Sequence, residues 1–137
     1  MTLNDAATVD RVVYTVDQGA GATNSDSNGN IAKANIYVAS DENAEQADWV
    51  RVVEGQACTY TNESKSATFS FEAQDNVKKV IVEVLNTEGD PANTYIAGMK
   101  MELLNGENTV AIANITADMD AHSGNGPSNM IADNQIP

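Results

Sequence analysis

Cysteine, histidine and aromatic residues are scarce in this chain of 137 residues. The one cysteine, Cys58, excludes an internal disulfide, so the cysteine count does not reveal the redox compartment. No stretch of about 18 apolar residues occurs, so the sequence contains no apolar segment long enough to span a membrane. The motifs H-E-x-x-H, G-x-S-x-G and the Walker loop are also missing, and no Ser or Cys beside the one histidine, His122, suggests a catalytic triad. We therefore expect a protein without catalytic activity.

Basic residues are few as well: seven Lys and Arg stand against twenty Asp and Glu, and the formal charge is −13. A surface of this charge repels nucleic acid and anionic lipid, so we expect no nucleic-acid partner and no membrane insertion. Paired carboxylates are what glycoside hydrolysis requires. Most of the acidic residues stand in turns such as Asp41-Glu42, however, where solvation explains them without catalysis. The charge favours neutral partners.

Apolar residues make up 42% of the chain, enough for one domain, residues 1–137, with its own core. They recur at every second position, for example at Val12, Tyr14 and Val16, which predicts strands with one buried face. Short strands at regular spacing, without a helical period, predict an all-β fold, an antiparallel β-sandwich. The expected strands are residues 8–16, 33–38, 49–53, 57–61, 67–72, 77–85 and 96–104, with Asp75-Asn76 separating 67–72 from 77–85.

The segment from Gly29 to Gln56, GNIAKANIYVASDENAEQADWVRVVEGQ, contains two of these strands, an acidic turn between them and the only tryptophan, Trp49. Three further segments complete the pattern of the chain: LNDAATVDRVVY at residues 3–14, FSFEAQDNVKKVIVEV at 69–84 and the loop that leads to Tyr95-Ile96-Ala97-Gly98. As an ordered set they resemble the discoidin, or coagulation factor type C, family, which includes galactose-binding-like carbohydrate-binding modules. The resemblance covers residues 3–104 and implies a jelly-roll sandwich with Trp49 packed between the sheets.

The tail, residues 111–137, resembles the beginning of the same family, although it stands at the end of this chain. Two explanations are open: the chain is cut from a tandem array, so that the tail begins the next copy, or it is circularly permuted, so that the tail supplies its own first strand. Asn105-Gly106 between two alternating segments predicts a β-hairpin, and a sandwich without its first strand exposes an edge. We favour closure by the tail. The simpler alternative is a hairpin at 105–116 followed by a loop.

The resemblance implies that a neutral, galactose-like glycan binds to loops at one end of the sandwich. Proteins bind sugars with an aromatic ring under the C–H face of the sugar and a few hydrogen bonds to its hydroxyls. The matching loops are residues 17–30, 86–95 and 121–129, and the expected glycan-binding residues are Tyr95, Asn93, Asp17, Gln18 and His122. Tyr95 is the expected platform, with the alternative that it closes the core at the end of its strand.

Asp17 departs from the family pattern, because members that bind galactose-like sugars tend to carry an arginine there. A carboxylate accepts hydrogen bonds from sugar hydroxyls but repels acidic sugars. Either the module recognises another neutral sugar or the site is lost. A second function therefore stays open, that of a protein-interaction or spacer module that binds no sugar.

The resemblance also implies one structural calcium ion, and Asp133 and Asn134 match the first of its ligands. The glutamate that completes such a site falls on Gly98 or Lys100, depending on the register, and Glu102 is displaced from it. Members of the family are parts of larger multidomain proteins of the extracellular space or cell surface, some of them adhesion proteins. We expect the same here, as a segment of a longer secreted protein, although no signal peptide follows Met1.

Overall fold

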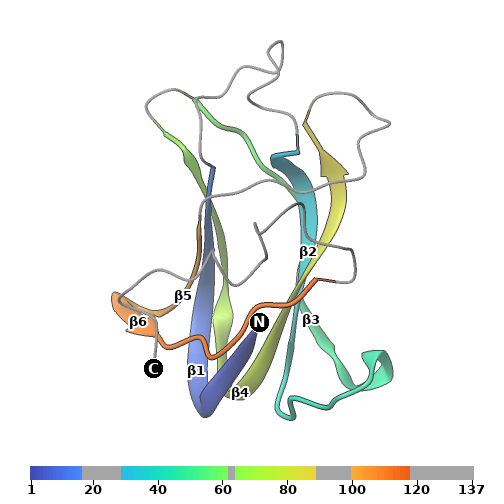
Figure 1. The fold of residues 1–137 in the computed structure, drawn as a ribbon, viewed down its shortest axis with the longest axis vertical. Coiled ribbons are helices and arrows are strands. Elements are labelled where there is room, and N and C mark those ends of the chain that lie inside the picture. Colours follow the sequence, from blue (N-terminus) through green and yellow to red (C-terminus); the bar gives the residue numbers. More distant parts are fainter. Residues whose placement is uncertain (17–28, 62–63, 89–99, 118–137) are drawn as a thin grey trace.

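The computed structural model describes residues 1–16, 29–61, 64–88 and 100–117. Within them, six antiparallel strands form one sheet in the order β3-β2-β4-β1-β5-β6 (Figure 1). A short 3-10 helix, η2 (Gln46–Asp48), precedes β3. The predicted all-β antiparallel fold is confirmed. The strands are β1 (Thr2–Thr15), β2 (Ile31–Ala39), β3 (Val50–Ala57), β4 (Ser66–Thr87), β5 (Lys100–Asn105) and β6 (Asn108–Val110).

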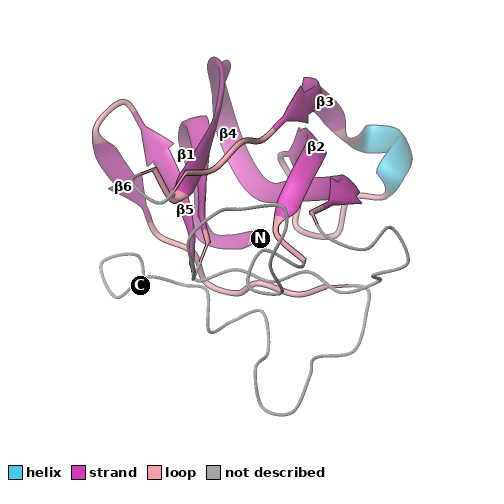
Figure 2. Cartoon of the chain, turned by 90° about the horizontal axis from the view of Figure 1, so that it is seen from above, coloured by secondary structure: helices cyan, strands magenta, loops and turns pink. Residues whose placement is uncertain are grey.

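The long strand β4, with 22 residues, takes part in both layers of the sandwich. Its residues 66–70 pair with β1 and its residues 79–87 pair with β2. The strand β1 bends in the same way, because Thr2 lies beside Lys79 whereas residues 11–15 pair with both β4 and β5. Figures 1 and 2 show the resulting arrangement, in which β2 and β3 lie on one side and β5 and β6 on the other. Strands that pass from one layer to the other form the corners of such sandwiches.

Asp75-Asn76 forms a bulge inside β4 and not a break between two strands. Between the residues that pair with Gln74 and Val77, β4 has one more residue than β1, and Asn76 has a left-handed backbone with φ 59. An extra residue in one strand shifts its register against the partner strand. The register of β4 against β1 shifts again between Val77 and Lys79, so Phe69 and Val77 are buried at odd positions and Val80 at an even one. The two strands predicted here are one.

Both layers contribute to one hydrophobic core, as the alternation of the sequence predicts. Val12, Tyr14 and Val16 of the β1 region are fully buried. Ala34, Ile36 and Val38 of β2 are buried as well, and they share a single cluster with Phe69 of β4 and Leu103 of β5.

The hairpin at Asn105-Gly106 is confirmed, since Asn105 pairs with Asn108 across a two-residue turn. Gly106 stands first in that turn with φ 62, a conformation that glycine adopts without steric cost. The strand predicted at 57–61 is wrong, because β3 ends at Ala57. The chain beyond it stays attached to the sheet, as the Cys58 N–H donates to the Ala32 carbonyl at 2.8 Å.

Residues 111–117, the described part of the tail, lie beside the beginning of β1. The Thr2 N–H donates to the Asn114 carbonyl and the Ala113 N–H to the Thr2 carbonyl, each at 2.9 Å. Ile112 and Ile115 are buried in the core cluster. This part of the tail therefore belongs to the same sandwich as the rest of the chain, and residues 118–137 lie outside the described residues.

Trp49 lies on the outer face of the sheet, and its predicted place between the sheets is wrong. Tyr37 of β2 pairs with Arg51 and the preceding residue, Ile36, pairs with Val53, so β3 has one extra residue between the two pairs. This bulge breaks the alternation that gives Trp49 and Val53 the same parity in the sequence. Val53 is therefore buried beside Ile36, whereas Trp49 is only half-buried and contacts Tyr37.

Candidate functional site

All residues predicted to bind a ligand lie outside the described residues. The structure does describe the strand ends that border residues 17–28 and 89–99. The predicted glycan-binding residues concerned are Asp17, Gln18, Asn93, Tyr95 and His122, and the predicted calcium ligands are Asp133 and Asn134.

Two of these strand ends lie side by side at one end of the sandwich. The Gly29 N–H donates to the Glu88 carbonyl at 3.1 Å, and the Glu88 N–H donates to the Asn30 carbonyl at 2.8 Å. The chain that enters β2 and the chain that leaves β4 are therefore joined there. Burial raises the pKa of the Glu88 carboxyl above its usual value.

Two buried tyrosines hold the start of β2 beneath these strand ends. The Tyr60 hydroxyl donates to the Ile31 carbonyl at 2.7 Å, and the Ile31 N–H points to the Tyr14 hydroxyl oxygen at 3.4 Å. Their rings pack edge to face with centroids 6.1 Å apart. Burial raises the pKa of both phenols and of the neighbouring Cys58 thiol. These groups stay neutral near pH 7 and form a rigid support beneath the strand ends.

Asn30 is the polar side chain at this end that the protein leaves incompletely paired. It is 2% exposed, and its Nδ2 has no hydrogen-bond partner, while its backbone carbonyl accepts from Glu88. Buried amide groups are nearly always hydrogen-bonded. The strand ends next to the predicted loops therefore combine a buried amide donor on Asn30 with a carboxyl group on Glu88, two kinds of group that can bond to hydroxyls.

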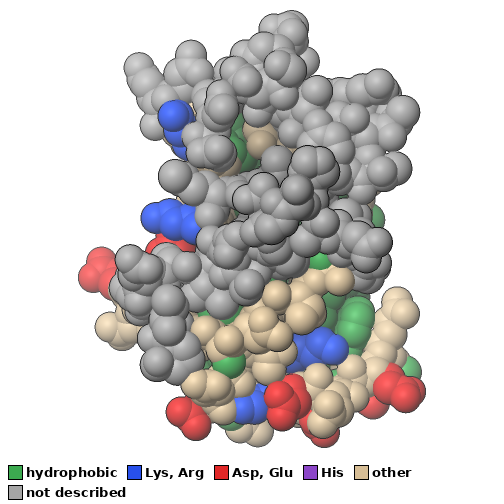
Figure 3. Space-filling model, viewed as in Figure 1, with side chains coloured by type: hydrophobic (Ala, Val, Ile, Leu, Met, Phe, Trp, Pro, Cys, Tyr) green, Lys and Arg blue, Asp and Glu red, His purple; other side chains and the backbone are tan. Residues whose placement is uncertain are grey.

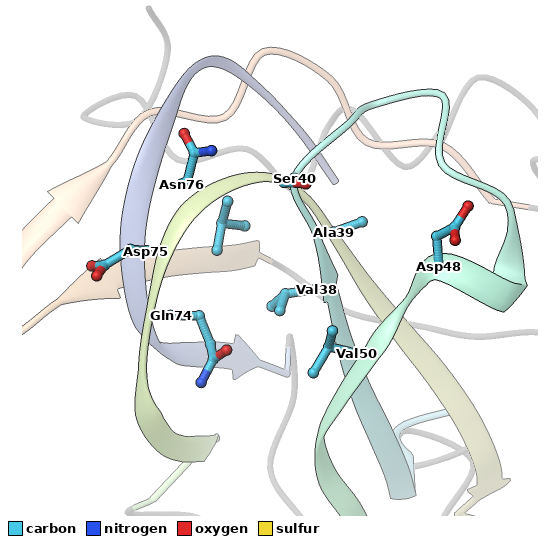
Figure 4. A pocket seen from close by; sticks show the side chains of 9 residues that line it. Val38, Ala39, Ser40, Asp48, Val50, Gln74, Asp75 and Asn76 are labelled. Carbon is cyan, nitrogen blue, oxygen red and sulfur yellow. The ribbon is translucent and has the colours of Figure 1, made fainter.

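A shallow hollow of about 140 Å³ lies between the β2–β3 connection and the β4 bulge. Apolar side chains form its floor, and Figure 4 shows Val38 and Val50 close together at its centre, whereas the carboxylates of Asp48 and Asp75 point outward. The Asp75 carboxylate accepts a hydrogen bond from the Thr8 hydroxyl at 2.9 Å. Ligand pockets usually have volumes of about 300 Å³ or more. The hollow is therefore large enough for a side chain of a partner but small for a sugar.

The outer face of β3, β2 and β4 carries a cluster of aromatic and charged side chains, which we call the aromatic face: Trp49, Tyr37, Lys79, Glu83 and Asn35. The Trp49 and Tyr37 ring centroids lie 5.8 Å apart with the planes at 54°, and the Lys79 ammonium lies 5.1 Å from the Trp49 ring centroid. Sequence reasoning missed this cluster. The sequence did contain a signal for it. Lys33, Asn35 and Tyr37 occupy every second position of β2, between the apolar residues, and so lie on the face of the strand that points away from the core.

Metal and membrane sites receive no positive support from the described part of the chain. Among residues 1–16, 29–61, 64–88 and 100–117, no three His, Cys, Asp or Glu side chains are grouped so that they could hold a metal ion. In the same residues, no helix has the length and hydropathy needed to cross a membrane.

The described residues define the protein as an antiparallel β-sandwich, with a buried unpaired amide at one end and an aromatic outer face. The sequence matches no protein-family model and no curated protein, and the fold matches no solved structure.

Proposed function

We propose that this chain is a non-catalytic carbohydrate-binding module of the discoidin type, which recognises neutral, galactose-like glycans through the loops at one end of its sandwich. The observation that carries the proposal is the polar base under that end. Asn30 has a buried amide donor without a partner, and Glu88, whose backbone N–H is bonded to the Asn30 carbonyl, adds a carboxyl group at the same pair of strand ends. Sugar hydroxyls both donate and accept, so they are suited to such a pair.

The charge of the chain supports a neutral ligand. At −13, the protein repels uronic and sialic acids, and Asp17 in the predicted site adds to this repulsion. A neutral hexose is not repelled by this charge, and it still offers hydroxyls to the carboxylates and a C–H face to Tyr95. We propose that the module belongs to a larger extracellular protein, in which several weak sites act together through avidity.

Calorimetric titration with neutral monosaccharides, together with a glycan array, tests the proposal. We expect millimolar affinity for at least one neutral sugar, as is usual for shallow single sites, and no binding of acidic sugars. Tyr95→Ala should abolish binding at the loop site, whereas the control Tyr95→Phe, which keeps the ring, should retain it. Flat titrations with every sugar would reject the proposal.

The alternative function, a protein-interaction or spacer module, has its own supporting observation. Val50 at the hollow is 55% exposed, and a neighbouring domain that packed there would remove its apolar surface from water. If all sugar titrations are flat, cross-linking or pull-down with the neighbouring domains of the parent protein is the next measurement, and Val50→Asp should weaken the contact.

A structural calcium ion is the remaining proposal, with Asp133 and Asn134 as its first ligands. If calcium binds the folded chain, the melting temperature rises with calcium concentration and falls on addition of a chelator. Equal melting temperatures in millimolar calcium and in chelator would reject this site, and Asp133→Asn is the matching variant.

A further inference from the structure

The aromatic face is built by three neighbouring strands whose outward positions coincide. Tyr37 of β2 pairs with Arg51 on one side and with Ile81 on the other, and Ala39 pairs with Lys79. Side chains at these positions point to the same side of the sheet. The ring at position 49, two residues before Arg51, therefore lies on the outer face beside Tyr37 and under the ammonium group of Lys79.

The Trp49 ring is held in place before any ligand arrives. Its indole N–H donates to the Ala44 carbonyl at 3.0 Å, in the turn before η2, and Tyr37 and Lys79 contact the ring itself. A fixed aromatic ring loses little conformational entropy when a ligand stacks on it. Because the side chain is half-buried, part of the indole remains in contact with solvent.

Polar groups that suit sugar hydroxyls stand next to the rings. The Glu83 Oε1 accepts from the Asn35 Nδ2 at 2.7 Å and from the Tyr37 hydroxyl at 3.1 Å. The Asn35 Oδ1 in turn accepts from the Gly55 N–H at 2.6 Å, so the carboxylate is anchored to the sheet. None of these bonds uses the Glu83 Oε2, which is thus left to accept from a ligand, and Lys79 provides a donor nearby.

The charge of this face differs from that of the chain as a whole. Arg51 and Lys79 stand on it with Glu83, and Glu54 pairs with Arg51 at 3.5 Å, so two positive charges meet two negative ones in a chain whose formal charge is −13. Figure 3 shows acidic and basic side chains near one another at the lower end of the molecule. A balanced face with fixed rings favours a neutral ligand that has both a C–H face and hydroxyl groups.

We propose that the aromatic face is a second sugar-binding site, at which one neutral hexose ring stacks on Trp49 and Tyr37 and donates a hydroxyl hydrogen bond to Glu83. This inference rests on the proposed carbohydrate-binding function. The second site uses none of the residues predicted to bind sugar in the loops. Two sites on one module allow a branched or repeating glycan to be held at two points, which raises its apparent affinity.

Tryptophan fluorescence tests the second site directly, because Trp49 is the only tryptophan of the chain. The folded chain is titrated with D-galactose, D-glucose and D-mannose, and with the open-chain polyol sorbitol as a ligand control that lacks a ring face. We expect a saturable change in emission with at least one hexose, in the millimolar range, and none with sorbitol.

Variants separate this site from the loop site. Tyr37→Ala should raise the Kd measured by fluorescence about tenfold, since it removes one stacked ring. Glu83→Gln keeps the Oε1 acceptor for Asn35 and Tyr37 and should raise the Kd several-fold. This second variant keeps the test valid if Tyr37→Ala fails to fold. Tyr95→Ala should leave the fluorescence titration unchanged while it removes the binding assigned to the loops.

The outcomes distinguish the two proposals. A fluorescence response that persists in Tyr95→Ala and is weakened in Tyr37→Ala and Glu83→Gln supports the second site. No fluorescence response, with calorimetric binding that Tyr95→Ala abolishes, overturns the second site and leaves the proposed function standing. A response equal for hexoses and sorbitol, or no sugar binding by either method, overturns the second site, and the latter result overturns the proposed function with it.

Discussion

Replacing Asn76 by valine tests the bulge that joins the two layers of the sandwich. The Asn76 side chain is exposed, so the substitution changes little buried surface and acts mainly through the backbone. Its φ of 59 lies in the left-handed region, which costs most residues about 1–2 kcal/mol and which asparagine and glycine tolerate better. We expect Asn76→Val to lower the free energy of unfolding by about 1–2 kcal/mol and Asn76→Gly to change it by less than about 0.5 kcal/mol.

Equilibrium unfolding in urea, with the slope held in common, measures these changes. Ala73→Val is the matched control, because Ala73 is also exposed and lies in the same strand, where valine is well accepted. It should leave the stability unchanged or raise it slightly. If Asn76→Val is as stable as Ala73→Val, the left-handed backbone does not hold the bulge, and the reasoning is refuted.

Three further predictions concern buried groups. Tyr60→Phe removes the donor to the Ile31 carbonyl and should cost about 1–3 kcal/mol of unfolding free energy in urea; an unchanged midpoint would contradict this. Burial and the charge of Lys79 lower the pKa of the Met1 amino group from 8.0 to about 6, so the unfolded chain takes up this proton first as the pH falls. The free energy of unfolding is therefore highest above pH 8 and should decrease by about 2–3 kcal/mol as the pH falls to 6. The Nα-acetylated chain should lack this decrease. Burial raises the pKa of the Cys58 thiol, so a disulfide reagent should modify the native protein far more slowly than the urea-unfolded protein, and equal rates would refute this.

Alternation in the sequence was sufficient to predict which side chains form the core of β1, β2 and β5. Tyr14, Ile36 and Leu103 are buried as their positions in the alternation indicate. Successive side chains of a strand point to opposite faces, so only every second side chain can face the core. The Asn-Gly hairpin was equally local, because turn geometry depends on the few residues in it.

Bulges escaped prediction because they depend on the partner strand. Asp75-Asn76 favours a left-handed backbone, and a turn and a bulge both use this conformation. The extra residue between Arg51 and Val53 has no signature of its own in the sequence, and it alone moves Trp49 from the core to the surface. The aromatic face was therefore hidden from sequence analysis, although each of its residues was visible.

What the sequence determined by itself was the class of fold, the inward faces of most strands and the sign of the surface charge, because these follow from local alternation and composition. Only the tertiary structure decided that β1 and β4 bend through both layers, that residues 111–117 lie beside the first strand, and that Trp49 faces outward. The physical reason is that register and bulges are set by hydrogen bonds between strands far apart in the chain, and a single residue of register determines which side of the sheet a side chain occupies.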